Sequence, residues 1–456
     1  MPLEVLNPAT GEKLESFEEI SPEKVRAAIE TADAAFQSWR RVPFEQRAIP
    51  MRKAAAVLRA RAEDLAQMAA VEMGKPVVQG RSEVEKCAWV CEYYAERAES
   101  FLEDEPVASD AARSFVAYEP LGVVLAVMPW NFPFWQVFRF AAPALMAGNA
   151  GVLKHASNVP GCGQAIEEIF LEAGFPKGLF KNLMIGSSKV EAAIQHPLVR
   201  AVTLTGSTPA GRAVASSAGR ALKKTVLELG GSDPYLVLED ADLEKAAAAC
   251  SASRLINGGQ SCVAAKRFIV VEPVKERFEK LLVRNMGASV MGSPLEEETT
   301  LGPQARVDLR NELHDQVVRS LAQGARLLLG GTLPEGPGAF YPATVVTDVK
   351  KGMSLYAEET FGPVAAVIGV TGTEEAIEVA NDSVFGLGAA VFTADPGKGE
   401  EIAARRLEAG CCFVNSYVKS DPRLPFGGIK ESGYGRELSS FGIREFVNIK
   451  TVYIAA

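Results

Sequence analysis

Segments long enough for amphipathic helices alternate along this chain with short runs rich in valine, isoleucine and other apolar residues. Such runs lie at Gly122 to Val127, Ala150 to Leu153 and Ala201 to Thr205, with helix-length stretches between them. Parallel strands require these crossovers, because each strand must start from the same end of the sheet. The alternation therefore predicts an α/β fold built on a parallel sheet.

Other runs extend this series on both sides. The further strand candidates are Phe115 to Tyr118, Leu183 to Ile185, Pro234 to Leu238, Arg267 to Val271, Val364 to Ile368 and Cys412 to Asn415. The last four form a second α/β series, and 456 residues are too many for one ordinary core. We therefore expect a second domain, with a boundary near residue 230.

Helices dominate the first hundred residues. Pro22 to Trp39 follows Ser21 and has the signals of a capped amphipathic helix. The stretch from Phe44 to Cys91 is predicted to form two more helices.

The composition favours small-molecule chemistry. The chain has 48 Lys and Arg against 57 Asp and Glu, a net charge of −9, and no basic stripe, so no nucleic-acid partner is expected. The most apolar stretch, Gly122 to Phe138, is interrupted by Pro129 and Pro133, which argues against a membrane span. The 3 histidines lack the spacing of metal ligands, so we expect no metal site.

Seven cysteines make no disulfide framework in a chain of this size. The start, Met1-Pro-Leu-Glu-Val, lacks the basic and then apolar plan of a signal peptide. We therefore expect the reducing cytoplasm.

Cys262 is the cysteine with polar neighbours, since it follows Asn257-Gly-Gly-Gln-Ser. Upstream, Glu228 lies in Leu227-Glu-Leu-Gly-Gly231. A thiolate can form a covalent intermediate, and a carboxylate can activate the water that breaks it. The alternative for any free cysteine is a small buried hydrophobe. We interpret the others in that way: Cys87, Cys91, Cys162, Cys250, Cys411 and Cys412.

The segment Ala201 to Arg212 combines a strand, a Gly206-Ser207 turn and the start of a helix. Free N–H groups and the helix dipole favour a phosphate at such a place. The spacing of Gly206 and Gly211 matches a P-loop, but Arg212-Ala213 replaces the required Lys-Ser/Thr pair. The segment therefore argues against a nucleoside triphosphatase and is compatible with a dinucleotide pyrophosphate.

Asn131 and Arg139 are polar residues in an apolar region. Asn131 comes just before Pro133, a favoured first helical residue, and its amide could donate to an oxyanion. Arg139 shares a helix face with Trp135 and Gln136. A guanidinium in so apolar a helix needs a carboxylate, which could be a structural Asp or Glu or the substrate's own. The residues alone leave both open.

Together these motifs resemble the NAD(P)-dependent aldehyde dehydrogenase superfamily over essentially the whole chain. The motifs in family order are Pro129-Trp-Asn-Phe-Pro133, Thr205-Gly-Ser207, Glu228-Leu-Gly-Gly231, Gly259-Gln-Ser-Cys262, Glu359-Thr-Phe-Gly-Pro363 and Pro425-Phe-Gly-Gly-Ile-Lys-Glu-Ser-Gly433. The resemblance implies a Rossmann-like cofactor domain at 1–101 and 119–229 and a second α/β catalytic domain at 230–425. It also implies a small β oligomerisation element at 102–118 and 439–456.

The resemblance implies catalytic roles as well. Cys262 attacks the aldehyde carbon, Asn131 and the Cys262 backbone N–H hold the oxyanion, and Glu228 activates the hydrolytic water. The acylating branch of the family generally lacks this glutamate, so a free acid is the expected product. The residues implied to bind the cofactor are Trp130, Lys154, Ser157, Thr205, Gly206, Ser207, Leu229, Glu359 and Phe361.

Ser157 departs from the pattern of most NAD-preferring relatives, which carry a glutamate that holds the adenosine ribose. A carboxylate would repel a 2′-phosphate, whereas serine beside Lys154 can accept one. We expect NADP⁺ to be used and preferred over NAD⁺. The alternative is that Ser157 is merely permissive and both cofactors serve.

Arg139 lies eight residues after Asn131, where succinate-semialdehyde dehydrogenases carry an arginine that binds the distal carboxylate. A second arginine of some relatives is Ile256 here. Because an arginine–carboxylate contact tolerates one methylene, glutarate semialdehyde or a broader range of aliphatic aldehydes is the alternative to succinate semialdehyde. The residues implied to contact the substrate are Arg139, Trp135, Ser261 and Ser420.

The tail from Ser439 to Ala456 alternates like an edge strand, which invites pairing with another chain. Related enzymes use this tail, with a hairpin near residues 102–118, to form dimers or tetramers. We therefore expect a homodimer or a homotetramer.

Overall fold

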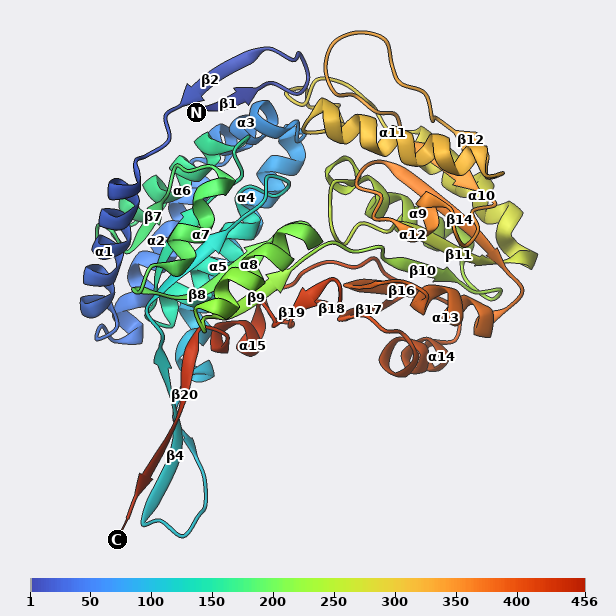
Figure 1. Ribbon diagram of the computed structural model, residues 1–456. Helices are drawn as coiled ribbons and strands as arrows, with labels where there is room; N and C mark the ends of the chain where they lie inside the picture. The colour runs from blue at the N-terminus through green and yellow to red at the C-terminus, as the bar shows by residue number, and fades with distance from the viewer. Residues whose placement is uncertain (1, 456) are drawn as a thin grey trace.

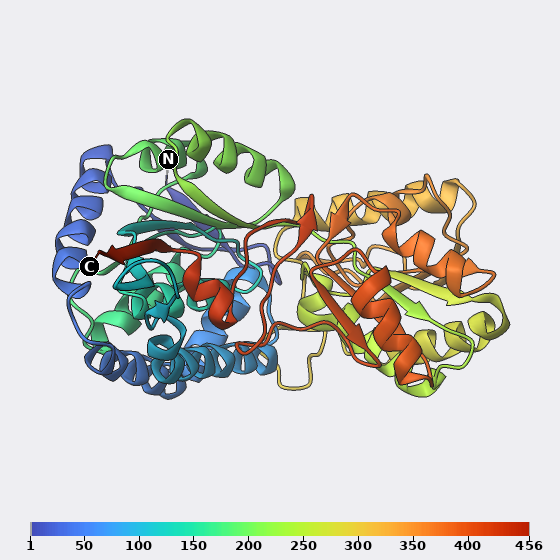
Figure 2. The same cartoon turned by 90° about the horizontal axis from the view of Figure 1, so that it is seen from below.

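Two α/β units, each built around its own mostly parallel sheet, make up the protein (Figure 1). The computed structural model describes residues 2–455. Seen from below, the units form two bodies side by side, and the C-terminal segment crosses from one to the other (Figure 2). The predicted fold class, two α/β units with parallel sheets, is confirmed.

The first unit contains a six-stranded sheet whose inner strands are almost fully buried. Neighbouring strands are parallel except for the first pair. In spatial order the strands are β19 (Gly433–Tyr434), β9 (Lys224–Glu228), β8 (Val199–Thr205), β5 (Val123–Val127), β6 (Ala150–Lys154) and β7 (Phe180–Asn182). The helices of this unit are α1 (Pro22–Trp39), α2 (Phe44–Ala60), α3 (Ala62–Met73), α4 (Val77–Phe101), α5 (Trp135–Met146), α6 (Pro160–Glu172), η1 (Ser187–Lys189), α7 (Val190–Gln195), α8 (Thr208–Arg220) and α15 (Ser439–Arg444).

The second unit contains a seven-stranded sheet, parallel apart from its first strand. In spatial order the strands are β12 (Arg326–Leu329), β13 (Thr344–Thr347), β14 (Val364–Val370), β11 (Arg267–Val271), β10 (Pro234–Val237), β16 (Gly388–Phe392) and β17 (Cys411–Val414). Its helices are α9 (Leu243–Leu255), η2 (Ile256–Gly259), α10 (Glu272–Gly287), α11 (Val307–Ala322), α12 (Ser354–Ala357), α13 (Thr373–Asn381), α14 (Pro396–Glu401) and η3 (Ile402–Arg406).

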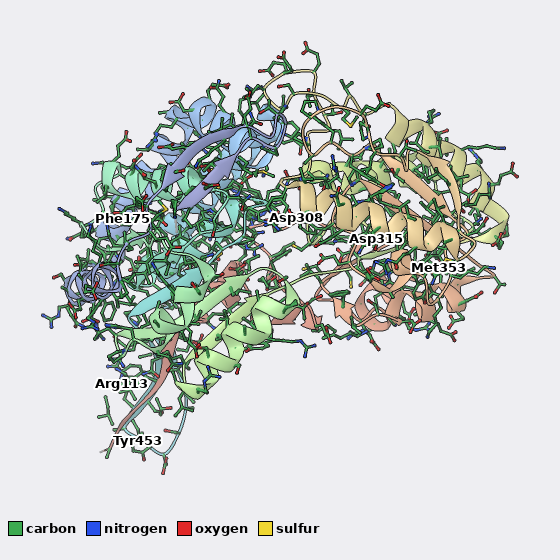
Figure 3. The ribbon with its side chains drawn as sticks, turned by 45° about the horizontal axis from the view of Figure 1, so that its top comes forward. Arg113, Phe175, Asp308, Asp315, Met353 and Tyr453 are labelled. Carbon is green, nitrogen blue, oxygen red and sulfur yellow. The ribbon has the colours of Figure 1, made fainter. Side chains whose placement is uncertain are left out.

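A three-stranded antiparallel arm projects from the first unit. It consists of β20 (Val447–Ile454) paired antiparallel with β4 (Arg113–Pro120), and β3 (Glu105–Pro106) adds a short third strand. Arg113 and Tyr453 lie near its outer end (Figure 3). Strands thus occur in both segments of the expected β element, although residues 439–444 form helix α15 instead.

Two hairpins complete the fold. One pairs β1 (Leu3–Leu6) with β2 (Lys13–Phe17), and the other pairs β15 (Phe385–Gly386) with β18 (Ile429–Lys430).

The carboxyl ends of β5 and β8 mark the point where the strand order of the first sheet reverses. The chain runs from β5 to β6 and β7 on one side and then returns to β8 and β9 on the other. Ligands of open α/β sheets bind in the crevice outside such a point. Trp130 and Asn131 follow β5, Gly206 and Ser207 follow β8, and Glu228 ends β9. These predicted site residues therefore emerge at one edge of the sheet.

Two local predictions were wrong in detail. Phe44 to Cys91 contains three helices rather than two, because Gly74, with φ of 81°, ends α3 and Pro76 precedes α4. Leu183 to Ile185 is not a strand, since β7 ends at Asn182 and the N–H of Ile185 bonds back to the carbonyl of Leu183. Both differences come from local turns that an apolar pattern does not reveal.

Gly80 allows α4 to pack closely on α3, and we expect Gly80→Ala to lower stability. An added Cβ would lie 2.9 Å from both Cα and Cβ of Ala66. Overpacking of this kind lowers the free energy of unfolding by about 1–3 kcal/mol. Gly219→Ala in α8 is the matched control, since its Cβ meets nothing within 4 Å, and it should stabilise by about 0.5–1 kcal/mol. Urea unfolding measures both, and a Gly80→Ala protein as stable as the wild type contradicts the packing argument.

Candidate active site

A pocket of about 530 Å³ lies where α4 and α5 face the segment that precedes β11. It is lined by Cys262 and by the four residues that the sequence assigned to the substrate, which are Trp135, Arg139, Ser261 and Ser420. The fold thus brings together candidates from distant parts of the chain. That these four side chains contact the substrate remains a prediction.

The loop before Cys262 has an unusual backbone. Asn257, Gly258 and Gly259 have φ angles of 53°, 62° and 75°, so three successive residues adopt the left-handed conformation. A Cβ at position 259 would collide with the backbone of Gly362. Glycine is therefore required there for the turn that presents the thiol.

Two buried cations hold the carbonyl groups of this loop. Lys266 donates to the carbonyl oxygens of Ser261 and Cys262 at 2.9 and 2.6 Å. Arg254 donates to the carbonyl of Gly259 at 2.7 Å. Both side chains are fully buried. Sequence reasoning missed them, because a lysine or arginine near a strand has no local mark that distinguishes it from a solvated one.

The Cys262 thiol is half-buried in the pocket. Burial raises the pKa of this thiol to about 12, while the positive charges of Lys266 and Arg139 oppose the rise. The thiol is therefore protonated at neutral pH in the free protein. A nucleophilic role requires that a base remove this proton.

Glu228 is a buried carboxyl group, with 2% of the residue exposed. Among residues 2–455, neither of its oxygens has a hydrogen-bond partner. Burial raises the pKa of Glu228 well above its ordinary value, repulsion from Glu437 adds to the rise, and Arg139 opposes it. The negative charge of Glu228 in turn helps to raise the pKa of Cys262, so the two groups lie within electrostatic range. An unpartnered carboxyl group of this kind suits proton transfer.

Asn131 is tied to the loop that carries the thiol. Its Nδ2 donates to the carbonyl of Gln260 at 3.0 Å, and its own backbone carbonyl accepts from Asn257 Nδ2 at 2.6 Å. An amide nitrogen carries a second hydrogen. The predicted role of that hydrogen, donation to an oxyanion at Cys262, stays a prediction.

Arg139 already has a carboxylate partner within the protein. Its guanidinium forms a buried ion pair with Glu437, and Nη2 donates to Thr205 Oγ1 at 3.3 Å. The guanidinium carbon also lies 4.7 Å from the ring centre of Phe426. The sequence left open whether a carboxylate of the protein or one of the substrate pairs with Arg139. The structure shows a pair with a carboxylate of the protein, Glu437. The guanidinium also borders the pocket, and its predicted contact with a substrate carboxylate stays a prediction.

Lys86 on α4 is a second cation in the pocket, and sequence analysis missed it. Its Nζ donates to Ser420 Oγ at 2.8 Å and lies 4.2 Å from a ring centre of Trp135. Within residues 2–455, no carboxylate pairs with it. Burial lowers the pKa of Lys86 to about 8, and the charge of Arg139 lowers it further.

Glu83, one helical turn before Lys86, fixes the start of α5. One carboxylate oxygen accepts from the backbone N–H groups of Phe134 and Trp135, each at 2.9 Å. The other pairs with the buried Lys75. A negative charge at this end of a helix is favourable. Glu83 lies on the buried face of α4 with Val84 and Cys87, a position that could have revealed it, whereas Lys86 has no such signal.

A second hollow, of about 740 Å³, contains three predicted cofactor residues, Trp130, Lys154 and Ser157. Lys154 ends β6 and is buried, and burial lowers the pKa of its ammonium. No carboxylate among residues 2–455 pairs with Lys154, so its charge is free for an anion. The Trp130 ring meets that of Phe361 edge-on, with centres 5.8 Å apart. Arg306 also lines this hollow.

The turn at Gly206 and Ser207 begins helix α8. Ser207 is the N-cap of this 13-residue helix, and its hydroxyl accepts from the N–H of Ala210 at 3.5 Å. The first N–H groups of a helix and its dipole suit a phosphate. The turn therefore has the structure that the pyrophosphate prediction requires.

The remaining predicted cofactor residues make contacts inside the protein. The Thr205 hydroxyl accepts from Arg139, Leu229 is buried, and Glu359 accepts from the N–H of Gly231 at 2.9 Å. Their cofactor roles stay predictions.

All 7 cysteines are free thiols. Within residues 2–455, no group of three or more His, Cys, Asp or Glu side chains could hold a metal ion. No helix in the same range is both long and apolar enough to cross a membrane.

Comparison with known proteins gives concordant matches. The model of the aldehyde dehydrogenase family matches residues 1–452. A Synechocystis sp. protein named "Probable succinate-semialdehyde dehydrogenase (NADP(+))" is 51% identical over 455 residues, and 100% of each chain is covered. An Escherichia coli K12 protein named "Succinate semialdehyde dehydrogenase (NAD(P)+) Sad" is 49% identical over 448 residues, covering 98% of this chain and 97% of that protein.

A solved structure also matches over the whole chain. The crystal structure of succinic semialdehyde dehydrogenase from Streptococcus pyogenes, in complex with NADP⁺ as the cofactor, has a TM-score of 0.97 at 39% identity. The match covers 99% of this chain and 100% of that one.

The ion pair of Arg139 with Glu437 predicts a loss of stability when it is broken. Arg139→Met leaves a buried carboxyl group without its partner, so the free energy of unfolding should fall by about 3–5 kcal/mol. Adding Glu437→Gln should recover part of this loss, because no unmatched charge remains. Urea unfolding of the wild type, both single variants and the double variant gives the coupling energy. An Arg139→Met protein as stable as the wild type would refute the structural role.

Proposed function

Since the chain belongs to the aldehyde dehydrogenase family, we propose that it oxidises succinate semialdehyde to succinate, with NADP⁺ preferred over NAD⁺. The observation that carries this proposal is a single pocket containing the Cys262 thiol together with the cations Arg139 and Lys86. An aldehyde and a carboxylate on one small molecule match that pair of features. The names of the relatives and of the Streptococcus pyogenes structure support the same substrate and cofactor.

In the proposed reaction Cys262 is the nucleophile. After the thiol loses its proton, Sγ adds to the aldehyde carbon, and an electron pair of the carbonyl moves onto oxygen. The free N–H of the Asn131 amide and the backbone N–H of Cys262 stabilise the resulting oxyanion. When bound, NADP⁺ supplies the two-electron acceptor that oxidation of this carbon requires.

We assign the second half of the reaction to Glu228. The acyl group remains on Cys262 as a thioester, and Glu228 accepts a proton from the water that attacks it. The water oxygen bonds to the acyl carbon, the carbon–sulfur bond breaks, and the thiolate leaves. Because the pKa of Glu228 is raised, the basic form increases as the pH rises, and hydrolysis should accelerate with it.

The hollow lined by Trp130, Lys154 and Ser157 contains donor groups that suit NADP⁺. The unpaired Lys154, with Ser157 beside it, suits the 2′-phosphate, which a glutamate at position 157 would repel. Ser207, at the start of α8, suits the pyrophosphate. Family resemblance assigns Glu359 and Phe361 to the nicotinamide half.

We also propose that copies of the chain assemble as a homodimer or homotetramer through the arm of β4 and β20. The 8-residue strand β20 exposes Ile449 and Tyr453 by 64% and 53%. An exposed strand with apolar side chains is a surface that another chain can cover. Light scattering measures the mass of the assembly, and a monomer would refute this proposal.

Reduced-nicotinamide absorbance tests substrate and cofactor together. The assay crosses NADP⁺ and NAD⁺ with succinate semialdehyde, glutarate semialdehyde and butanal. A charge-assisted contact contributes about 1.5–3 kcal/mol, so kcat/KM for the C4 acid aldehyde should exceed that for butanal by at least about tenfold. Ser157→Glu should lower kcat/KM with NADP⁺ by about tenfold or more through like-charge repulsion and largely spare NAD⁺. Equal use of butanal would reduce the assignment to a general aldehyde dehydrogenase.

Glu228→Gln should separate the two halves of the reaction. Loss of a general base slows the step it serves by about 10²–10⁴-fold, so steady-state turnover should fall by that amount. The first turnover should survive as a burst of reduced cofactor, because the thioester still forms. Stopped-flow absorbance measures both phases. Glu191→Gln, at an exposed glutamate that pairs with Arg220, is the control. If the burst is lost as well, then Glu228 is needed before the thioester forms. That outcome would contradict the assignment of Glu228 to the hydrolysis step only.

A further inference from the structure

The peptide bond between Ser261 and Cys262 carries the Cys262 N–H, which is one of the two oxyanion donors in the proposed reaction. A peptide unit is planar and almost always trans, so its C=O and N–H bonds point in opposite directions. Any group that fixes the carbonyl of Ser261 therefore also fixes the direction of the Cys262 N–H. The orientation of this donor depends on what binds that carbonyl.

Lys266 binds it from the side of the second sheet. Its Nζ donates to the carbonyl oxygens of Ser261 at 2.9 Å and of Cys262 at 2.6 Å. The residue directly precedes β11, and its backbone N–H donates at 3.1 Å to the carbonyl of Asp233, which directly precedes β10. The ammonium thus reaches the thiol loop from two neighbouring strands within the sheet.

Lys266 is fully buried, and a carboxylate lies beside its ammonium. Nζ is 3.6 Å from Oε1 of Glu359, and the same oxygen accepts from the N–H of Gly231 at 2.9 Å. Burial lowers the pKa of Lys266, while the charges of Glu359 and Asp233 oppose the fall. Two carbonyl oxygens and a nearby carboxylate therefore hold the ammonium against the loop.

The backbone around Cys262 has little room to rotate. A Cβ at position 231 would lie 2.8 Å from the carbonyl oxygen of Cys262, so this carbonyl packs closely on Gly231. One peptide earlier, Asn131 Nδ2 donates to the carbonyl of Gln260 at 3.0 Å. Three successive carbonyl groups, at 260, 261 and 262, thus accept from fixed side chains. The Cys262 N–H lies between them and is held on both sides.

A cation on the Ser261 carbonyl also changes the strength of the Cys262 N–H as a donor. Hydrogen bonds polarise one another along a chain, and an ionised donor makes a stronger bond than a neutral one. The peptide that accepts from Lys266 therefore has a more polar N–H than a peptide that accepts from water. A polar donor with a fixed direction suits a developing oxyanion.

We propose that Lys266 is a positioning residue, which binds the Ser261 and Cys262 carbonyl oxygens and thereby directs the Cys262 N–H toward the oxyanion and strengthens it as a donor. This inference rests on the proposed function, from which it takes the nucleophile and the oxyanion donor. It assigns a role to a buried lysine that lies outside all six sequence motifs.

Two reagents that consume the same thiol isolate this role. With p-nitrophenyl acetate, Sγ adds to the ester carbon, an electron pair moves onto the carbonyl oxygen, and collapse of this oxyanion expels p-nitrophenolate and leaves an acetyl thioester. With iodoacetamide, Sγ displaces iodide from a CH₂ carbon in one step, and no oxyanion forms. Both reactions need the Cys262 thiolate, and neither needs a cofactor or an acid aldehyde.

The ratio of the two rate constants at one pH therefore reports on the oxyanion. Burial raises the pKa of Cys262, and the charge of Lys266 opposes the rise. Loss of Lys266 should leave less thiolate and slow both reactions, but this effect cancels in the ratio. Absorbance of p-nitrophenolate in the first turnover gives one rate constant, and mass spectrometry of alkylated Cys262 gives the other. Cys262→Ala provides the background for both.

In Lys266→Met the ratio of ester acylation to alkylation should fall. Removing an oxyanion donor outright costs about 10²–10³-fold, so misdirecting and weakening one that stays in place should lower the ratio by about 10- to 100-fold. Lys266→Arg keeps a cation with N–H donors and should restore part of the ratio. Lys275→Met removes another buried lysine, which pairs with Glu279 and Asp348, and should leave the ratio unchanged.

Lys266→Gln keeps the test valid if Lys266→Met does not fold, which urea unfolding shows. The amide retains N–H donors without the charge, so the ratio should fall, but by less than in a folded Lys266→Met. An unchanged ratio in either folded variant, with both rates lowered equally, would mean that Lys266 acts on the thiol alone and would overturn the inference. The same fall in Lys275→Met would overturn it as well.

These outcomes differ from those that would refute the proposed function. If the ratio falls in Lys266→Met but the wild type does not oxidise succinate semialdehyde, then the substrate assignment is wrong and the role of Lys266 stands. If the wild type oxidises it and the ratio is unchanged in Lys266→Met, then only the role of Lys266 is wrong. If Cys262→Ala reacts with the ester as fast as the wild type, then both proposals fail, because they share this nucleophile.

Discussion

The buried ion pair between Arg139 and Glu437 connects the parts of this protein that the chemistry needs. It joins α5, which lines the pocket, to the segment before α15, which returns from the second unit to the first. Its two members also act on the predicted catalytic groups: the charge of Arg139 lowers the pKa values of Cys262 and Glu228, whereas the charge of Glu437 raises that of Glu228. Among residues 2–455, the other two cations that line the pocket, Lys86 and Lys419, form no ion pair.

The thiol depends on a loop that local preferences alone would not produce. Three successive left-handed residues are stabilised by buried donors, with Arg254 on the carbonyl of Gly259 and Lys266 on that of Cys262. Backbone strain of this kind persists when the surrounding structure fixes it. A thiol presented by this loop, within electrostatic range of the unpartnered carboxyl group of Glu228, suits the two-step covalent catalysis that we propose.

Much of the fold could be predicted because the core is regular. The helix Pro22–Trp39 and the strand Arg267–Val271 have the predicted bounds, since each has a clear periodicity and clear end signals. Three helices occupy Phe44 to Cys91 where two were predicted, because the chain turns both at Arg61 and at Gly74 without disturbing the apolar pattern around these residues. Cys262 and Glu228 could be selected because glycine and polar neighbours distinguish them from core residues.

The sequence by itself determined the α/β class, the family, and the thiol and carboxyl group that carry the proposed reaction, because these follow from patterns between near neighbours in the chain. The tertiary structure decided which charged side chains of the pocket are paired. Arg139 and Lys86 are equally charged in the sequence, but Arg139 pairs with Glu437, whereas Lys86 contacts Ser420 and the ring of Trp135. Neutralisation of a charge depends on distances between residues far apart in the chain, and the fold alone sets those distances.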